Sequence, residues 1–136
     1  MKNILVVEDD KLTKDFYNII FKRSGYNPII VEDVEKIFEV LDKLEISLII
    51  MDINLKNTYF SGEKYDGLKL SSLIKKDLRF SHIPIIIVTA YMPSVVEEEG
   101  QNKFRIDGFL NKPIADFSLL INKVNQLILQ WAIKYL

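Results

Sequence analysis

Short apolar runs rich in β-branched residues alternate along this chain with longer amphipathic segments, and this alternation constrains its fold most strongly. Runs of this kind occupy residues 4–7, 48–51 and 85–88. Strands that are apolar on both faces are typical of a parallel sheet that helices cover on each side. Alternation of such strands with helices indicates right-handed βαβ crossovers. We therefore expect a doubly wound α/β fold with five parallel strands and helices on both faces.

The remaining elements are predicted from apolar spacing and from capping residues. Further strands are expected at residues 27–31 and 108–110, and helical spacing of apolar residues fills the segments between strands. Gly25 is expected to end the first helix, and Asp33 and Asp116 are expected to cap the second and the last. The expected helices cover residues 12–24, 34–43, 67–77, 94–102 and 116–135.

The same spacing predicts an apolar face for each of three helices. These faces are Leu12, Phe16, Ile19 and Ile20 in the first helix, Ile37, Val40, Leu41 and Leu44 in the second, and Phe117, Leu120, Val124, Leu127 and Trp131 in the last. Leu129, Ile133 and Leu136 fall outside the last of these faces. They are either scattered surface residues or a contact with a partner or with a second copy of the chain.

Length and composition are those of one soluble domain. The chain has 136 residues, of which 49% are hydrophobic, and no cysteine, so a disulfide framework and a cysteine metal site are excluded. We expect residues 1–136 to form a single domain with its core at about residues 2–128 and a slightly extended C-terminal helix. The apolar run at residues 4–7 is too short for a signal peptide, and no run approaches membrane-spanning length. A cytoplasmic location is therefore expected.

The charge balance argues against direct nucleic-acid binding. The chain has 18 basic and 19 acidic side chains and a net charge of −1, whereas proteins that bind nucleic acids usually carry a basic excess. Neither nucleic acid nor a membrane is expected as a partner.

Chemically distinctive residues follow four of the predicted strands. Glu8 and Asp9 follow the first strand, Asp52 the third, Thr89 the fourth and Lys112 the fifth. Ligand sites of open α/β sheets lie beyond the carboxyl ends of the strands, so these side chains are expected to converge. Clustered carboxylates suit a hard divalent cation such as Mg²⁺. Together with a lysine and a hydroxyl, they match the needs of phosphoryl transfer to a carboxylate nucleophile.

Each of these residues alone has a structural explanation. Asp10 is expected to cap the first helix, and an aspartate at the end of a strand is usually a turn or cap residue. The occurrence of suitable residue types at four strand ends together is what favours a functional site.

The motifs at these strand ends resemble those of the receiver domains of two-component response regulators. The resemblance implies a flavodoxin-like, CheY-like fold with strand order 2-1-3-4-5. It spans nearly the whole chain, and the motifs occur in the expected order: ILVVEDD at residues 4–10, LIIMD at 48–52, DG at 66–67, PIIIVTA at 84–90 and GFLNKPI at 108–114.

The resemblance also implies a metal site. Asp52 and Asp9 would bind Mg²⁺ or Mn²⁺ directly, and Glu8 would bind it through water. The backbone carbonyl of Asn54 would be a further ligand.

The remaining roles also follow from the resemblance. Asp52 would be the phosphoacceptor, Thr89 would bind a phosphoryl oxygen, and Lys112 would pair with the acceptor and then with the phosphate. Phe109 stands at the aromatic position of the family's switch and would respond to Thr89. The peptide bond between Lys112 and Pro113 is expected to be cis.

The expected function is that of a single-domain response regulator. It would take a phosphoryl group from a sensor histidine kinase or a histidine phosphotransfer protein and bind an unknown output protein when phosphorylated. Its chemistry would be limited to self-catalysed phosphoryl transfer and slow autodephosphorylation, so it would not be a true enzyme. The alternatives are a phosphorelay intermediate and an interaction module that works without phosphorylation. A dehalogenase-like phosphatase would need a second aspartate where this chain has Asn54.

Two segments depart from the family pattern. Asp66 follows Asp52 by 14 residues, which makes the intervening loop longer than is usual and gives it an insertion at residues 56–65. The insertion is either a tolerated surface loop or a segment whose aromatic pair, Tyr59 and Phe60, shields the site or contacts a partner. Tyr91 is bulky beside the expected phosphate, and a long-lived phosphoryl group is therefore expected.

Overall fold

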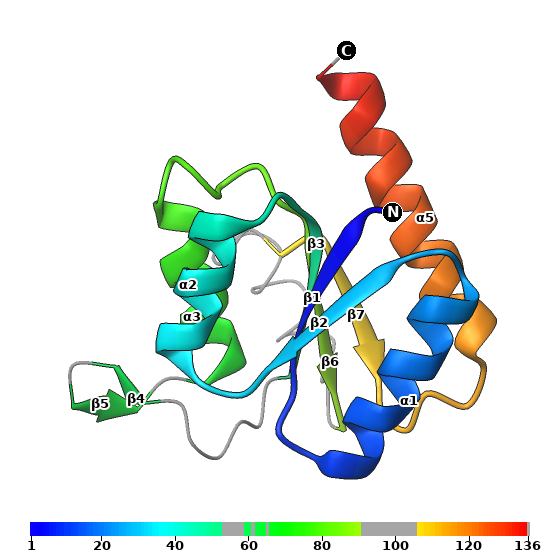
Figure 1. Ribbon diagram of the computed structural model, residues 1–136, viewed down its shortest axis with the longest axis horizontal. Coiled ribbons are helices and arrows are strands. Elements are labelled where there is room, and N and C mark those ends of the chain that lie inside the picture. Colours follow the sequence, from blue (N-terminus) through cyan, green and yellow to red (C-terminus); the bar gives the residue numbers. More distant parts are fainter. Residues whose placement is uncertain (53–58, 61, 65, 91–105, 136) are drawn as a thin grey trace.

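The computed structural model describes residues 1–52, 59–60, 62–64, 66–90 and 106–135 (Figure 1). A five-stranded parallel sheet lies at its centre, with strand order β2-β1-β3-β6-β7. In chain order of these five strands this is 2-1-3-4-5, so the predicted fold class is confirmed. The strands are β1 (Asn3–Val7), β2 (Asn27–Val31), β3 (Ile46–Asp52), β6 (Ile85–Thr89) and β7 (Gly108–Asn111).

Helices cover both faces of the sheet. Helices α2 and α3 lie on one face, and α1 and α5 lie on the other (Figure 1). Two hydrophobic clusters correspond to these layers, because alternate residues of β1 enter different clusters: Leu5 packs with α2 and α3, and Ile4 with α1 and α5. The described helices are α1 (Lys11–Arg23), α2 (Val34–Lys43), α3 (Gly67–Lys76) and α5 (Phe117–Lys134).

The helix predicted at residues 94–102 lies outside the described residues. Among the helices that the structure does describe, none has the length and apolar character needed to span a membrane.

Each described helix begins at an aspartate whose carboxylate accepts a hydrogen bond from a backbone N–H of the first turn. Such caps replace a hydrogen bond that the helix itself cannot supply. The caps predicted at Asp33 and Asp116 are confirmed, as is the capping role expected of Asp10. The N–H of Thr13 donates to Asp10 and that of Lys36 donates to Asp33. The N–H of Lys69 donates to Asp66 and that of Ser118 donates to Asp116.

The end of α1 depends on Gly25, as predicted. Gly25 has a φ of 86°, in the left-handed region that favours glycine. Its N–H donates to the carbonyl of Lys22, and the N–H of Tyr26 donates to the carbonyl of Phe21. These two bonds form a Schellman motif, which satisfies carbonyls at the helix end and turns the chain into β2.

The buried face of α1 is not the predicted apolar face. Tyr17 and Phe21 are buried, whereas Leu12, Phe16 and Ile19 are exposed, with Leu12 at 66%. Apolar residues occur on two sides of this helix, and the side that carries the two rings faces the sheet. The rings stack with centroids 6.1 Å apart, and aromatic side chains remove a large area from water.

The faces of the other helices agree better with their spacing. In α2 the predicted Leu44 is exposed because it follows the last helical turn, and Val34 is buried instead. In α5 the predicted residues Leu120, Val124 and Leu127 are buried. Phe117 and Trp131 are only partly buried, and Ile128 completes the buried face.

The segment predicted as a long loop contains a short hairpin. Strands β4 (Tyr59–Phe60) and β5 (Glu63–Lys64) pair antiparallel, and Gly62 between them has a φ of 79°. The hairpin lies apart from the five-stranded sheet (Figure 1). The side chains of Tyr59 and Phe60 lie outside the described part of the chain, and with them the predicted shielding of the site.

We predict that two phenylalanines of α1 differ strongly in their contribution to stability. Phe21→Ala should lower the free energy of unfolding by about 3–5 kcal/mol, because a buried ring is lost and a cavity remains. Phe16→Ala should lower it by about 1 kcal/mol or less, because that ring is half exposed. Equilibrium unfolding in urea measures both values, and equal losses would contradict the assignment of the buried face.

Candidate functional site

The register of the sheet brings the predicted site residues to one edge. Val7 of β1 pairs with Met51 of β3, so Glu8 and Asp52, the next residues, lie side by side. Thr89 ends the neighbouring strand β6, and its carbonyl accepts a hydrogen bond of 2.7 Å from the backbone N–H of Lys112. Residues from four strand ends therefore meet because the backbone pairing places them there.

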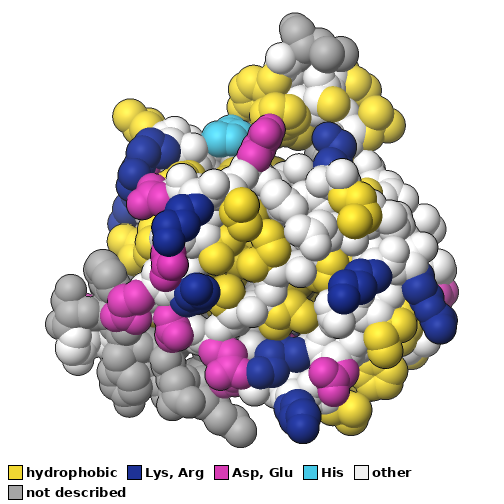
Figure 2. Space-filling model, in the orientation of Figure 1, with side chains coloured by type: hydrophobic (Ala, Val, Ile, Leu, Met, Phe, Trp, Pro, Cys, Tyr) yellow, Lys and Arg dark blue, Asp and Glu magenta, His cyan; other side chains and the backbone are white. Residues whose placement is uncertain are grey.

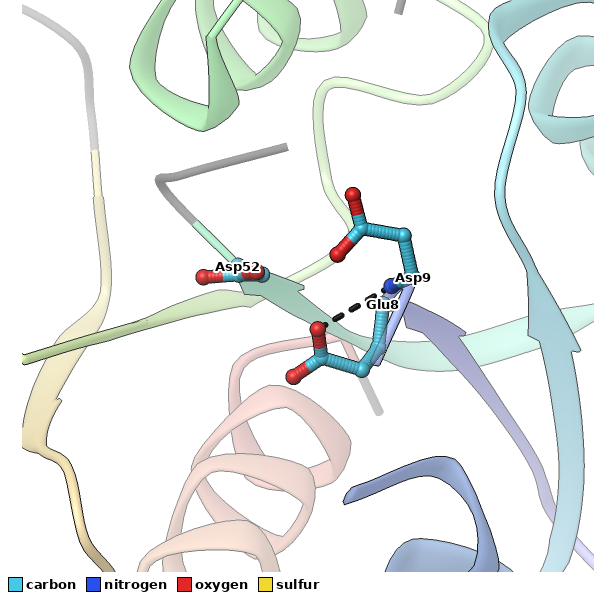
Figure 3. Close-up of side chains that lie close together, drawn as sticks. All are labelled: Glu8, Asp9 and Asp52. Carbon is cyan, nitrogen blue, oxygen red and sulfur yellow. Dashed lines mark hydrogen bonds between the residues drawn. The ribbon is translucent and has the colours of Figure 1, made fainter. Parts of the chain in front are cut away.

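Three carboxylates form a cluster at this edge. Oxygen atoms of Glu8, Asp9 and Asp52 all lie within 4.8 Å of one another (Figure 3). Glu8 and Asp52 are only 1% and 4% exposed, and Asp9 is partly buried. The Glu8 carboxylate accepts hydrogen bonds from the backbone N–H groups of Asp9, at 3.0 Å, and Asp10, at 3.3 Å. These bonds hold its oxygens beside those of Asp52.

The cluster has the chemistry of a divalent-cation site. Carboxylate oxygens are the ligands that Mg²⁺ and similar hard cations prefer, and such ions commonly bind one or two carboxylates and retain water. Asp10 caps α1 with its own carboxylate and is not part of the cluster. The carbonyl of Asn54, which the resemblance adds as a ligand, lies outside the described residues.

Lys112 bridges two of the carboxylates. Its ammonium nitrogen lies 3.0 Å from Glu8 Oε1 and 3.1 Å from Asp52 Oδ1, and the side chain is 25% exposed. The peptide bond between Lys112 and Pro113 is cis, as predicted. The lysine thus supplies positive charge where two nearly buried carboxylates lie together.

The electrostatics of the cluster follow from burial and crowding. Burial raises the pKa of Glu8 above its ordinary value of 4.5, the adjacent Asp52 raises it further, and Lys112 acts in the opposite direction. Burial by itself lowers the pKa of Lys112, but its hydrogen bonds and charge interactions with Glu8 and Asp52 outweigh burial and raise it. The ammonium form of Lys112 is therefore favoured.

Tyr17 is a neighbour of this site that the sequence did not single out. Burial, followed by the negative charges of Glu8 and Asp52, raises the pKa of its hydroxyl. The signal that could have found Tyr17 is its helical spacing with Phe21, four residues later, on the side of α1 that faces the sheet.

Thr89 and Phe109 lie on neighbouring strands. Thr89 is 1% exposed at the end of β6, and Phe109 lies on β7, paired with Ile87. Phe109 is partly buried and packs against the hydrophobic cluster beneath α2 and α3. Tyr91, which was expected beside a phosphate, lies outside the described residues.

An apolar groove adjoins the carboxylate cluster. It has a volume of about 450 Å³ and lies between α1 and the segment that follows β7. The rings of Phe16 and Phe117 stack at one wall, with centroids 5.8 Å apart. Lys112 belongs both to the groove and to the site, so the two are continuous. Other lining residues are Leu12, Pro113 and Ile114.

Comparisons with known proteins agree on one family. A family model described as "Response regulator receiver domain" matches residues 4–125. The polar-differentiation response regulator DivK of Brucella ovis is 27% identical over 114 residues, which cover 84% of this chain and 86% of that protein.

Solved structures of receiver domains superpose on nearly the whole chain. The receiver domain of the Francisella response regulator 1452 has a TM-score of 0.80 at 25% identity. The superposition covers 96% of this chain and 98% of the Francisella chain. A CheY-like receiver domain protein from Methanospirillum hungatei JF-1 has a TM-score of 0.82 at 22% identity, with 98% of each chain covered. The second of these likenesses supports the fold alone.

We predict that loss of Lys112 destabilises the metal-free protein mainly at neutral pH. Lys112→Ala should lower the free energy of unfolding by about 2 kcal/mol near pH 7, because two nearly buried carboxylates lose their counter-charge. Because the pKa of Glu8 is raised in the folded state, stability falls as pH rises from 4.5 through the folded-state pKa, and without Lys112 that fall becomes larger. The loss should therefore shrink below about pH 4, where Glu8 is protonated.

Unfolding in urea at both pH values, with a chelator present, measures this difference. Lys14→Ala is the matched control, because Lys14 pairs with Glu32 at the surface and should contribute less than about 1 kcal/mol. A loss for Lys112→Ala that does not change between the two pH values would contradict the electrostatic explanation.

Proposed function

Because the chain belongs to the response regulator receiver domain family, we propose that it accepts a phosphoryl group on Asp52 from a sensor histidine kinase or a histidine phosphotransfer protein. The observation that carries this proposal is the position of the Asp52 carboxylate, 3.1 Å from the Lys112 ammonium and within a carboxylate cluster suited to a cation. Receiver domains are signalling proteins and not classical enzymes.

In the proposed transfer, an oxygen of the Asp52 carboxylate attacks the phosphorus atom of a phosphohistidine on the donor. The P–O bond to Asp52 forms as the P–N bond breaks, and the electron pair of that bond stays with the imidazole nitrogen. Lys112 already contacts Asp52 and is long enough to pair with an oxygen of the transferred group. Its contact with Glu8 holds the ammonium at this edge before the donor arrives.

Asp9 and Asp52 would hold Mg²⁺ or Mn²⁺, with Glu8 acting through water and the backbone carbonyl of Asn54 as a further ligand. A bound divalent ion supplies positive charge that offsets the charge of the transferring phosphoryl oxygens. The Glu8 carboxylate is oriented for this role by its hydrogen bonds to two backbone N–H groups.

Thr89 and Phe109 are the residues that we propose to report phosphorylation. The Thr89 side chain stands next to the acceptor strand and would hydrogen-bond a phosphoryl oxygen, which adds a contact available only in the phosphorylated state. Phe109, one strand further, is partly buried and would change its packing as Thr89 moves. Phosphorylation would then shift a pre-existing equilibrium between two surfaces, one of which binds an output protein.

The groove between α1 and the segment after β7 is our candidate docking surface for the phosphodonor protein. A donor must bring its phosphohistidine to Asp52, and the groove shares Lys112 with the site. Its apolar walls and the exposed residues Leu12 and Phe16 suit an apolar helical surface of the donor.

After transfer, Tyr91 and Asn54 would slow attack by water on the phosphoryl group and so prolong its life.

We predict that phosphorylation depends on Asp52. Incubation with a small-molecule acyl phosphate and Mg²⁺ should add one phosphoryl group to the wild-type chain, and Asp52→Asn should abolish the addition because the nucleophile is lost. Intact-protein mass spectrometry measures the product. Asp66→Asn is the matched control, because Asp66 is an exposed cap residue and asparagine is also a good cap. A phosphorylated Asp52→Asn chain would disprove the assignment.

We also predict that Mg²⁺ stabilises the protein through the carboxylate cluster. Addition of Mg²⁺ should raise the midpoint of thermal unfolding of the wild type, because a ligand that binds only the folded state stabilises it. Asp9→Asn should remove at least about half of this increase, and Asp15→Asn, an exposed change on α1, should leave it intact. Differential scanning calorimetry measures the shifts, and an equal shift in all three chains would place the metal elsewhere.

A further inference from the structure

Helix α5 carries a second stripe of side chains on the face that points away from the sheet. Leu120, Val124 and Leu127 pack inward, at spacings of 4 and 3. The outward stripe also recurs at alternating spacings of 3 and 4, and all of its members are exposed. It consists of Leu119, Asn122, Gln126, Leu129 and Ile133. A helix with such a stripe on each side can pack against two neighbours at once.

The outward stripe contains large apolar side chains. Leu119 and Leu129 are each 61% exposed, and Ile133 is 65% exposed. The last turns of α5 project beyond the sheet, and Figure 2 shows hydrophobic side chains gathered over this projecting end. The stripe is therefore open to a neighbour along the helix.

We propose that this outward stripe of α5 binds the same stripe of a second copy of the chain, with the two helices antiparallel. In that arrangement Leu119 of each copy faces Leu129 of the other, and Asn122 faces Gln126. Apolar side chains thus meet apolar ones and amides meet amides, with each contact occurring twice by symmetry. The inference does not depend on phosphorylation of Asp52.

The two amides argue for a second copy over an unrelated apolar partner. A wholly apolar helix or groove would bury Asn122 and Gln126 without hydrogen-bond partners, which is costly. The same stripe of another copy offers an amide opposite each amide. Polar residues within such a seam also select one register over the others.

Charge is compatible with self-association. From Phe117 to Lys134 the helix contains two lysines and no acidic residue, and neither Lys123 nor Lys134 belongs to the stripe. No like charges therefore face each other across the seam. The antiparallel arrangement also sets opposite helix dipoles side by side.

We predict a weak dimer that a single charge in the stripe disrupts. Sedimentation velocity of the full chain, at concentrations up to about 1 mM, should show reversible dimerisation, because one helix pair is a small interface. Leu129→Lys, at a position 61% exposed, should raise the dissociation constant about tenfold or more, because it places a charge opposite the apolar Leu119 of the other copy. Leu78→Lys is the matched control, because Leu78 is an apolar residue 90% exposed outside α5.

Circular dichroism of both variants confirms that they are folded, since each change is at an exposed position. A wild-type chain that stays monomeric over the whole range would overturn the proposal, and so would a Leu129→Lys chain that dimerises as the wild type does.

The register has a separate test, because the chain has no cysteine of its own. Asn122→Cys and Gln126→Cys chains are mixed and oxidised mildly. The antiparallel arrangement should give mixed disulfides in excess over either self-linked product, since these two positions face each other. Predominantly self-linked Asn122→Cys chains would show a parallel arrangement and overturn the proposed one.

Discussion

The pairing of Lys112 with Glu8 and Asp52 is the interaction on which the carboxyl edge of the sheet depends. Both carboxylates are almost completely buried, and charges in such a position are costly without a nearby opposite charge. One ammonium group within 3.1 Å of both offsets part of that cost. The remaining negative charge is of the kind that a bound cation would offset, so the electrostatic cost of the site and its proposed chemistry have the same origin.

Backbone pairing, more than side-chain packing, positions these groups. Glu8 and Asp52 lie side by side because β1 and β3 are paired in a fixed register, and Lys112 lies near because β7 continues the sheet beyond β6. Hydrogen-bonded strands are rigid, so the site needs little reorganisation. The helix caps add to this rigidity, since the Asp10 carboxylate begins α1 directly after the acidic residues.

Among the helices that the structure describes, α1 and α5 differ from α2 and α3 in their outer surface. Both helices bury one face against the sheet and still present large apolar side chains elsewhere: Phe16 and Leu12 beside the site, and Leu129 and Ile133 along the projecting end of α5. Contiguous exposed apolar surface is uncommon unless another protein covers it. The groove includes Phe117 and the outward stripe of α5 begins at Leu119, so the two surfaces are close together but share no residue.

The sequence by itself determined the fold class, the strand order through the family resemblance, the helix caps and the identity of the residues at the carboxyl edge. Apart from the strand order, these are local properties, because each depends on the residues along one strand or at one helix end. Only the tertiary structure decided which side of α1 is buried. Apolar residues occur on both sides, and the choice depends on how Tyr17 and Phe21 fit the sheet. It also decided that Lys112 contacts Glu8 in addition to the expected Asp52, and that a hairpin forms at residues 59–64. Contacts between residues far apart in sequence leave no periodic signal in any one segment, and two-residue strands are too short to show one.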